Sequence, residues 1–212
     1  MTNRKVFVSV ITSPFSSLPE IDQKDARNVA LLSAFIISGV NVISSVLFLS
    51  RISFIDFPIF GVVLFSVLLV TASVISFFTS WLILSFIYYL VATILGGEGN
   101  FKDVFLFFGC AQIPFIFTAV LRIVALIYME DTISISVSQG LQSPQTLLKT
   151  LLAVLNPEWL RFFSVIIGLW VQSVGCFTLI KTQNLTVKKT LLCLPLVSLT
   201  FFFQIVFSGQ RI

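Results

Sequence analysis

The chain has 212 residues, of which 57% are hydrophobic and 10% are charged, and its mean hydropathy is +1.06. Soluble globular chains carry about 25% charged residues, so a soluble fold is excluded and much of the apolar surface must face lipid. The net charge of +4 does not indicate a nucleic-acid partner, because the basic residues lie between apolar runs, where they set membrane orientation. The chain has no histidine, and its three cysteines lack metal-ligand spacing. We therefore expect a polytopic membrane protein without enzymatic chemistry, metal or cofactor.

The first 27 residues are polar to amphipathic and are expected to form a short cytosolic segment. The first membrane span is expected at about residues 28–49. A helix of that length covers roughly 33 Å, which is enough to cross a bilayer core of about 30 Å. Asn41 is a polar residue inside this span.

The next apolar run, residues 59–95, contains no charge and only Gly61 as a breaker near its start. Two spans need about 40 residues plus a turn. We therefore predict one long tilted span at about residues 64–95, whose preceding residues follow the interface. Two shorter spans remain the alternative.

A glycine-rich hinge follows this run. Gly96, Gly97 and Gly99 suit a helix stop and a tight turn. Asn100 is a good N-cap for the next helix, and Asp103 stands at the third position after it. A phosphate-binding loop is excluded, because no Lys-Ser or Lys-Thr pair follows a glycine at the required spacing.

The third span is expected at residues 104–128, with a kink where Gln112 and Pro114 interrupt its middle. Arg122 lies inside this span, about two turns before its far end. A guanidinium within a span faces the bundle interior or reaches back to the interface. Acidic residues expected on the same side of the membrane are candidate partners for it: Glu130, Asp131 and Glu158.

Two interpretations of Arg122 remain open. In the first, it is a structural residue that pairs with an acid or with the interface and fixes helix packing. In the second, it belongs to an ion or substrate pathway of a small transporter or channel. The intramembrane amides that would line such a pathway are Asn41, Gln112 and Gln172.

Residues 129–161 form the one long loop, which we expect outside the membrane. Serine alternates with isoleucine and valine from Ile133 to Ser138. Ser143-Pro144 then indicates a helix start, and Asn156-Pro157 indicates its stop. A helix of about 12 residues is too short to span, so we expect an amphipathic helix on the membrane surface.

The fourth span is expected at residues 160–180 and the fifth at residues 191–207. Small residues on the fourth span, Ser164, Gly168 and Gly175, suit close contact with another helix. The predicted fold is therefore an all-α bundle of five transmembrane helices over residues 28–212.

The distribution of basic residues predicts the topology. With five spans, one side carries Arg4, Lys5, Lys24, Arg27, Lys102, Lys181, Lys188 and Lys189. The other side carries Arg51, Lys149, Arg161 and Arg211. Lysine and arginine in short loops mark the cytoplasmic side, so we predict the N-terminus in the cytoplasm and the C-terminus outside a cell membrane.

The order of motifs resembles the Yip domain family of Ypt/Rab-interacting proteins. The resemblance covers most of the chain, and its most specific part runs from the glycine hinge to Pro114. The matching motifs are Ser13-Pro14-Phe15, Leu95-Gly96-Gly97-Glu98-Gly99-Asn100-Phe101-Lys102, Gly109-Cys110-Ala111-Gln112-Ile113-Pro114, Leu155-Asn156-Pro157 and the tryptophan-bearing fourth span that ends at Lys181.

The resemblance implies a five-helix integral membrane domain with a cytosolic N-terminus. Eukaryotic members carry a long cytosolic N-terminal region and act with small GTPases in vesicle traffic. Only about 27 residues precede the first expected span here, so the resemblance implies a prokaryotic member. Some prokaryotic members are linked to ABC-type exporters. The expected role is a scaffold or accessory subunit that binds lipid and other membrane proteins, including ABC-type transporter components or further copies of itself.

Overall fold

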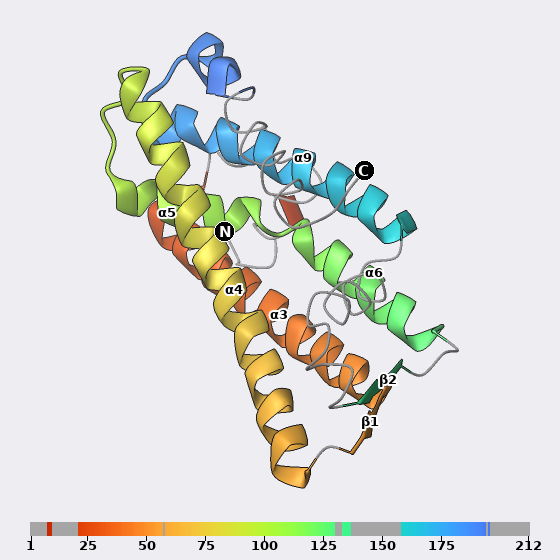
Figure 1. Cartoon of the computed structure of the whole chain (residues 1–212). Coiled ribbons are helices and arrows are strands. Elements are labelled where there is room, and N and C mark those ends of the chain that lie inside the picture. The colour runs from red at the N-terminus through yellow and green to blue at the C-terminus, as the bar shows by residue number, and fades with distance from the viewer. Residues whose placement is uncertain are drawn as a thin grey trace. The chain divides into compact units, whose positions relative to one another are not determined.

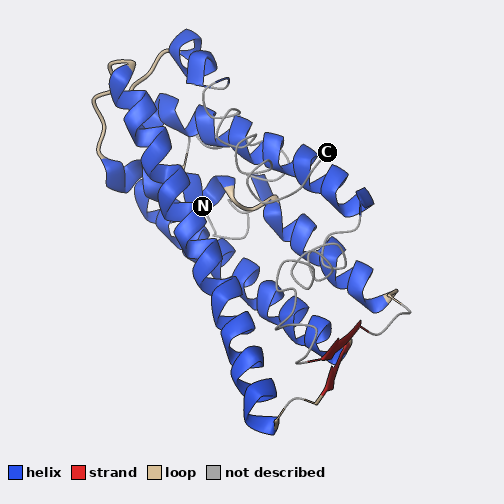
Figure 2. Cartoon of the chain, viewed as in Figure 1, coloured by secondary structure: helices blue, strands red, loops and turns tan. Residues whose placement is uncertain are grey.

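The computed structural model describes residues 8–9, 21–56, 58–129, 133–136, 158–193 and 195. Nearly all of these residues are helical (Figure 2), as expected of an all-α membrane protein. Within the described ranges, three helices are long and apolar enough to cross a membrane, and a bent helix pair can supply a fourth span. Most of the fifth expected span, residues 191–207, lies outside the described residues, and so does the expected surface helix at residues 144–155.

The first two long helices are α3 (Gln23–Ser50) and α4 (Ile59–Ile94) (Figure 1). The 36 residues of α4 form one unbroken helix, because the run contains no proline and no charge that would favour a turn. One long helix was expected at about residues 64–95, and α4 begins five residues earlier, at Ile59. An unbroken helix leaves no turn between two shorter spans. At 1.5 Å per residue α4 is about 54 Å long, so it must tilt or extend beyond a hydrocarbon core of about 30 Å.

The expected third span is a bent pair of helices, α5 (Phe101–Ala111) and α6 (Phe115–Ile127), whose axes differ by 42°. The break falls on Gln112, Ile113 and Pro114. Proline has no amide hydrogen to continue the helix. The amides just before it bond three residues back instead of four, from Gln112 to Gly109 and from Ile113 to Cys110, each at 3.3 Å.

The fourth expected span corresponds to α9 (Glu158–Thr182), and residues 187–193 after it are also helical. Contacts divide the described residues into two compact units. The first unit contains the residues up to Ile36, Phe78–Phe115 and those from Ile166 onward, and the second contains Ile37–Phe77 and Ile116–Val165.

The second unit contains a pair of strands that the sequence analysis missed. Strand β1 (Ile52–Ile55) pairs in parallel with β2 (Ile133–Ser136), with Ile52 opposite Ile133. The alternation of serine and isoleucine at β2 has the period of a strand. Its partner is four residues long and distant in sequence, so neither segment alone indicates the pairing.

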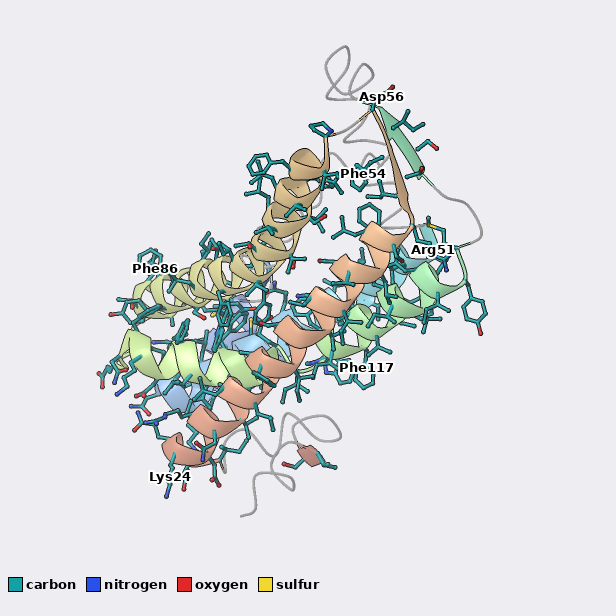
Figure 3. All side chains as sticks on the ribbon, turned by 90° about the horizontal axis from the view of Figure 1, so that it is seen from below. Lys24, Arg51, Phe54, Asp56, Phe86 and Phe117 are labelled. Carbon is teal, nitrogen blue, oxygen red and sulfur yellow. The ribbon has the colours of Figure 1, made fainter. Side chains whose placement is uncertain are left out.

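A small apolar core lies beside β1. Phe48, Ile52 and Leu126 are its buried centre, and the rings of Phe54 and Phe65 meet edge to face at 5.7 Å between centroids. Arg51, labelled in Figure 3, follows α3. Its Nη2 donates a hydrogen bond to the carbonyl of Ile127 at 3.0 Å. The strand pair, the core and this hydrogen bond join the C-terminal ends of α3 and α6.

Candidate functional site

The glycine hinge stops α4 with a left-handed turn. Gly96 has a φ of 84°, which strains residues that carry a side chain. Its amide bonds to the carbonyl of Thr93 at 3.0 Å, and the Gly97 amide bonds to the carbonyl of Ala92 at 2.8 Å. This pair of bonds is a Schellman motif, which satisfies carbonyls that the end of the helix leaves free.

Asn100 then starts α5. Its side-chain oxygen accepts a hydrogen bond from the Asp103 amide at 2.9 Å, and its Nδ2 donates to Asp103 Oδ2 at 2.9 Å. The second carboxylate oxygen of Asp103 accepts from Gln23 Nε2, at the first turn of α3. The N-cap expected from the sequence thus also connects α5 to α3.

Gln183, just past the end of α9, holds the hinge. Its side-chain oxygen accepts from the Gly99 amide at 3.2 Å, and its backbone oxygen accepts from the Glu98 amide at 3.2 Å. A Cβ on Gly99 would collide with the backbone oxygen of Thr182, so glycine is required there for the close approach. The role of Gln183 could not be predicted from the sequence, because a polar residue after a helix gives no signal of a distant partner.

Lys181, near the end of α9, contacts the segment just before α3. Its Nζ donates to the carbonyl of Ile21 and lies 5.4 Å from the centroid of the Phe107 ring, within cation–π range. The start of α3, the glycine hinge and the end of α9 therefore meet at one end of the first unit. The topology prediction had placed these three segments on a common side.

A buried polar contact joins α4 to α9. The Tyr88 hydroxyl donates to the backbone oxygen of Gln172 at 2.9 Å and also contacts its side-chain oxygen. The Tyr88 and Phe108 rings lie 4.7 Å apart, and a Cβ on Gly175 would come within 2.6 Å of the Phe108 ring. Gln172 is therefore engaged in packing, and Gly175 allows helices of this chain to approach one another.

Gly109 marks a second close approach. A Cβ there would lie 2.7 Å from the Ala30 Cβ and would also collide with the Trp81 ring. Ser33 Oγ donates to the Gly109 carbonyl at 3.0 Å. The Trp81 ring stacks on Phe105 at 4.4 Å between centroids. These contacts interlock α3, α4 and α5 at the motif that carries the family resemblance.

The remaining predicted residues are divided between the units. Gln112 is 3% exposed in the first unit, and its Nε2 has no hydrogen-bond partner among the described residues. Asn41 is half-buried on the part of α3 that belongs to the second unit. On α9, Gly168 is buried and Ser164 is half-buried.

Arg122 lies on the inward face of α6 in the second unit. Thr118, Ala119 and Leu126 are buried, and residues three or four apart on a helix share a face, so Arg122 lies between buried positions. Its Nε is buried without a hydrogen-bond partner among the described residues. The side chains of the three acids expected to pair with it lie outside the described part of the chain.

The family of this chain follows from a comparison with known proteins. The model of the Yip1 domain matches residues 8–208. The chain belongs to the Yip1 domain family. No curated protein and no solved structure matches it. The matched stretch includes every helix and strand described above, so the hinge, the Gly109 crossing and the Tyr88–Gln172 contact are features of a Yip1 domain.

The Yip1 domain family is associated with membrane trafficking, and its members are not known as enzymes. Within the described ranges, no group of three His, Cys, Asp or Glu side chains could hold a metal. The three cysteines of this Yip1 domain are free and buried. Buried thiols of this kind behave as small apolar side chains.

Proposed function

We propose that this Yip1 domain is a scaffold or accessory subunit of a membrane transport or trafficking assembly, without catalytic activity of its own. The observation that carries the proposal is the exposure of α4. In its most apolar 18-residue window no residue is buried within the described chain, whereas 33% of the corresponding window in α3 and 50% in α9 are buried. A helix segment without buried residues offers its sides to lipid and to other membrane proteins.

The packing of the first unit supports a binding role. Gly109 and Gly175 sit where a single added carbon would collide with a neighbouring helix. Close contacts of this kind hold helices in a fixed arrangement, which suits a protein that presents a surface to partners. The partners we propose are components of ABC-type transporters or further copies of this chain.

The proposed arrangement in the membrane follows the charge distribution. Residues 1–27 and the glycine hinge face the cytoplasm, five spans occupy residues 28–212, and residues 129–161 and the C-terminus lie outside. The contacts of Gln23 with Asp103 and of Lys181 with Ile21 support a common side for three of these segments. The proposed location is the cytoplasmic membrane of a cell.

Photo-crosslinking in intact membranes tests the scaffold. A photoreactive residue replaces Val67 or Ile75 on α4, which are 56% and 58% exposed. Matched control positions are Val120 on α6 and Ile166 on α9, which are 45% and 47% exposed. We expect both α4 positions to crosslink to the same protein while the controls yield mainly lipid adducts. Lipid adducts alone at both α4 positions would contradict a scaffold that uses this helix.

A small transporter or channel is the second candidate function, and the position of Arg122 on the inward face of α6 favours it. The test is ion or solute flux through vesicles that contain the purified protein. The decisive outcome is an Arg122→Leu protein that inserts and folds normally but loses a flux that the wild type supports. That result would support the transporter proposal and contradict the scaffold proposal. Absence of flux in the wild type removes the transporter proposal.

A further inference from the structure

The register between α3 and α6 is fixed at their C-terminal ends. Leu126 packs with Phe48 and Ile52, and Arg51 bonds to the carbonyl of Ile127. The helices run in the same direction into the parallel strands β1 and β2 (Figures 1 and 3). Positions that precede these contacts by equal numbers of residues therefore lie at similar levels along the two helices.

A row of polar residues, here called the polar seam, lies on α3 and α6 one and two turns before these contacts. One turn before Leu126 is Arg122, and one turn before Phe48 is Ser44, which is 4% exposed. A second turn reaches Thr118 on α6 and the level of Asn41 on α3. Polar side chains therefore lie at the levels of Arg122 and Thr118 on both helices, and the Ser44 hydroxyl among them donates to the Val40 carbonyl of its own helix at 2.9 Å.

This seam carries hydrogen-bonding capacity that the described residues leave unused. Thr118 is 7% exposed, and its Oγ1 has no hydrogen-bond partner in the described chain, like Arg122 Nε. Ser38 Oγ, on the same unit's part of α3, is also buried without a described partner. Buried polar groups without partners destabilise the folded protein, and charged groups do so more strongly, so a ligand that bonds to them stabilises it.

The charge of the seam selects the ligand class. In the second unit the one acidic side chain that the structure describes is that of Asp56, which is exposed in the loop after β1. Arginine offers donors only, in a planar fork that matches the oxygens of phosphate, and a threonine hydroxyl adds one more donor. Arg122 lies five residues before the end of α6, about 7.5 Å along the helix, so a group at the membrane interface can reach it.

We propose that Arg122 and Thr118 bind a phosphate group, carried by a lipid headgroup or free in solution. Arg122 supplies the charge and the Nε donor, and Thr118 supplies a hydroxyl one turn away on the same face of α6. The proposal stands independently of the scaffold role, because it concerns a bound anion and not a protein partner.

The test titrates the purified, delipidated full chain in a neutral detergent without phosphate. The probes are dioctanoyl phosphatidylglycerol, inorganic phosphate, and dioctanoyl glycerol as a matched lipid that lacks phosphate. The readout is the unfolding temperature, followed by tryptophan fluorescence. A saturable rise with phosphatidylglycerol alone assigns the site to a lipid headgroup, and a rise with inorganic phosphate assigns it to a free anion. No rise with either, or an equal rise with dioctanoyl glycerol, overturns the proposal.

Conservative variants separate binding from folding. Arg122→Lys keeps the charge but removes the Nε donor, and Thr118→Val keeps the shape but removes the hydroxyl. We expect each to weaken the apparent affinity for the responding probe by about tenfold, as the loss of a charge-assisted hydrogen bond implies. Ser66→Ala on α4 is the control in the same unit, because the Ser66 hydroxyl already donates to the Val62 carbonyl, and its titration should match the wild type. Wild-type affinity in both seam variants contradicts the assignment.

Discussion

Tyr88 on α4 donates a hydrogen bond from its hydroxyl to the backbone oxygen of Gln172 on α9, at 2.9 Å. Tyr88 is 0% exposed and Gln172 is 2% exposed, so water does not compete for either group. A directional bond inside an apolar bundle fixes the relative rotation and level of two helices, which apolar packing alone specifies less sharply.

Removing this bond should destabilise the fold measurably. We expect Tyr88→Phe to lower the free energy of unfolding by about 0.5–2 kcal/mol, because a buried acceptor loses its donor. Titration with a denaturing detergent measures the change. Gln172→Leu removes the side-chain oxygen that the Tyr88 hydroxyl also contacts, so the two effects should be non-additive in a double-mutant cycle. Additive effects would show that the hydroxyl and the amide side chain do not interact.

The two close-packed glycines should tolerate no side chain. Gly175→Ala and Gly109→Ala should each cost about 1–3 kcal/mol of unfolding free energy, because the added methyl group collides with an aromatic ring. Gly39→Ala is the matched control. It is also within a helix, with nothing within 4 Å of the added carbon, so it should be neutral or stabilising by up to about 1 kcal/mol. Equal losses at all three positions would contradict this explanation.

Gln183→Leu should loosen the hinge at one identifiable amide. The Gly99 amide bonds to the Gln183 side chain, whereas the Glu98 amide bonds to the Gln183 backbone, which the substitution retains. We therefore expect hydrogen exchange to accelerate at Gly99 much more than at Glu98. Gln183→Glu keeps a side-chain oxygen as acceptor and should protect Gly99 better than leucine does. Similar acceleration at both amides would indicate general unfolding of the hinge instead.

Cysteine labelling tests the sides of the membrane. Lys102 and Ser134 are exposed, and the three native cysteines are buried, so new thiols at these two positions should dominate the signal. We expect a membrane-impermeant maleimide to label Ser134→Cys in intact cells and Lys102→Cys only after permeabilisation. Labelling of Lys102→Cys in intact cells would reverse the proposed orientation.

A reporter fused after Ile212 tests the number of spans. Five spans place the C-terminus outside, where a fused phosphatase is active and a fluorescent protein that needs the cytoplasm is not. Fluorescence with no phosphatase activity indicates an even number of spans. The five-span proposal would then fail.

The long helices were predictable from the sequence, because an apolar run in a hydrocarbon environment must form its backbone hydrogen bonds internally, as a helix does. The expected span at residues 28–49 lies within α3, and the expected long span ends one residue from the end of α4. The contacts between helices were not predictable, because the partner of a single Tyr88 or Gln183 is set by tertiary packing. Gln172 illustrates the difference, since its position indicates only a polar group within a span, whereas the contact of its side-chain oxygen with the Tyr88 hydroxyl depends on how α4 packs on α9. The pairing of β1 with β2 was missed for the same reason.

The parallel pairing of β1 and β2 also constrains the order in which the chain can assemble. Seventy-seven residues, 56–132, separate the two strands, and they include all of α4, α5 and α6. Strand β1 leaves the ribosome long before its partner exists, so its backbone groups stay unpaired until α6 has been synthesised and laid beside α3. The C-terminal ends of these helices are therefore joined late in assembly. The strands can pair only after the intervening helices have been inserted in the right number and direction.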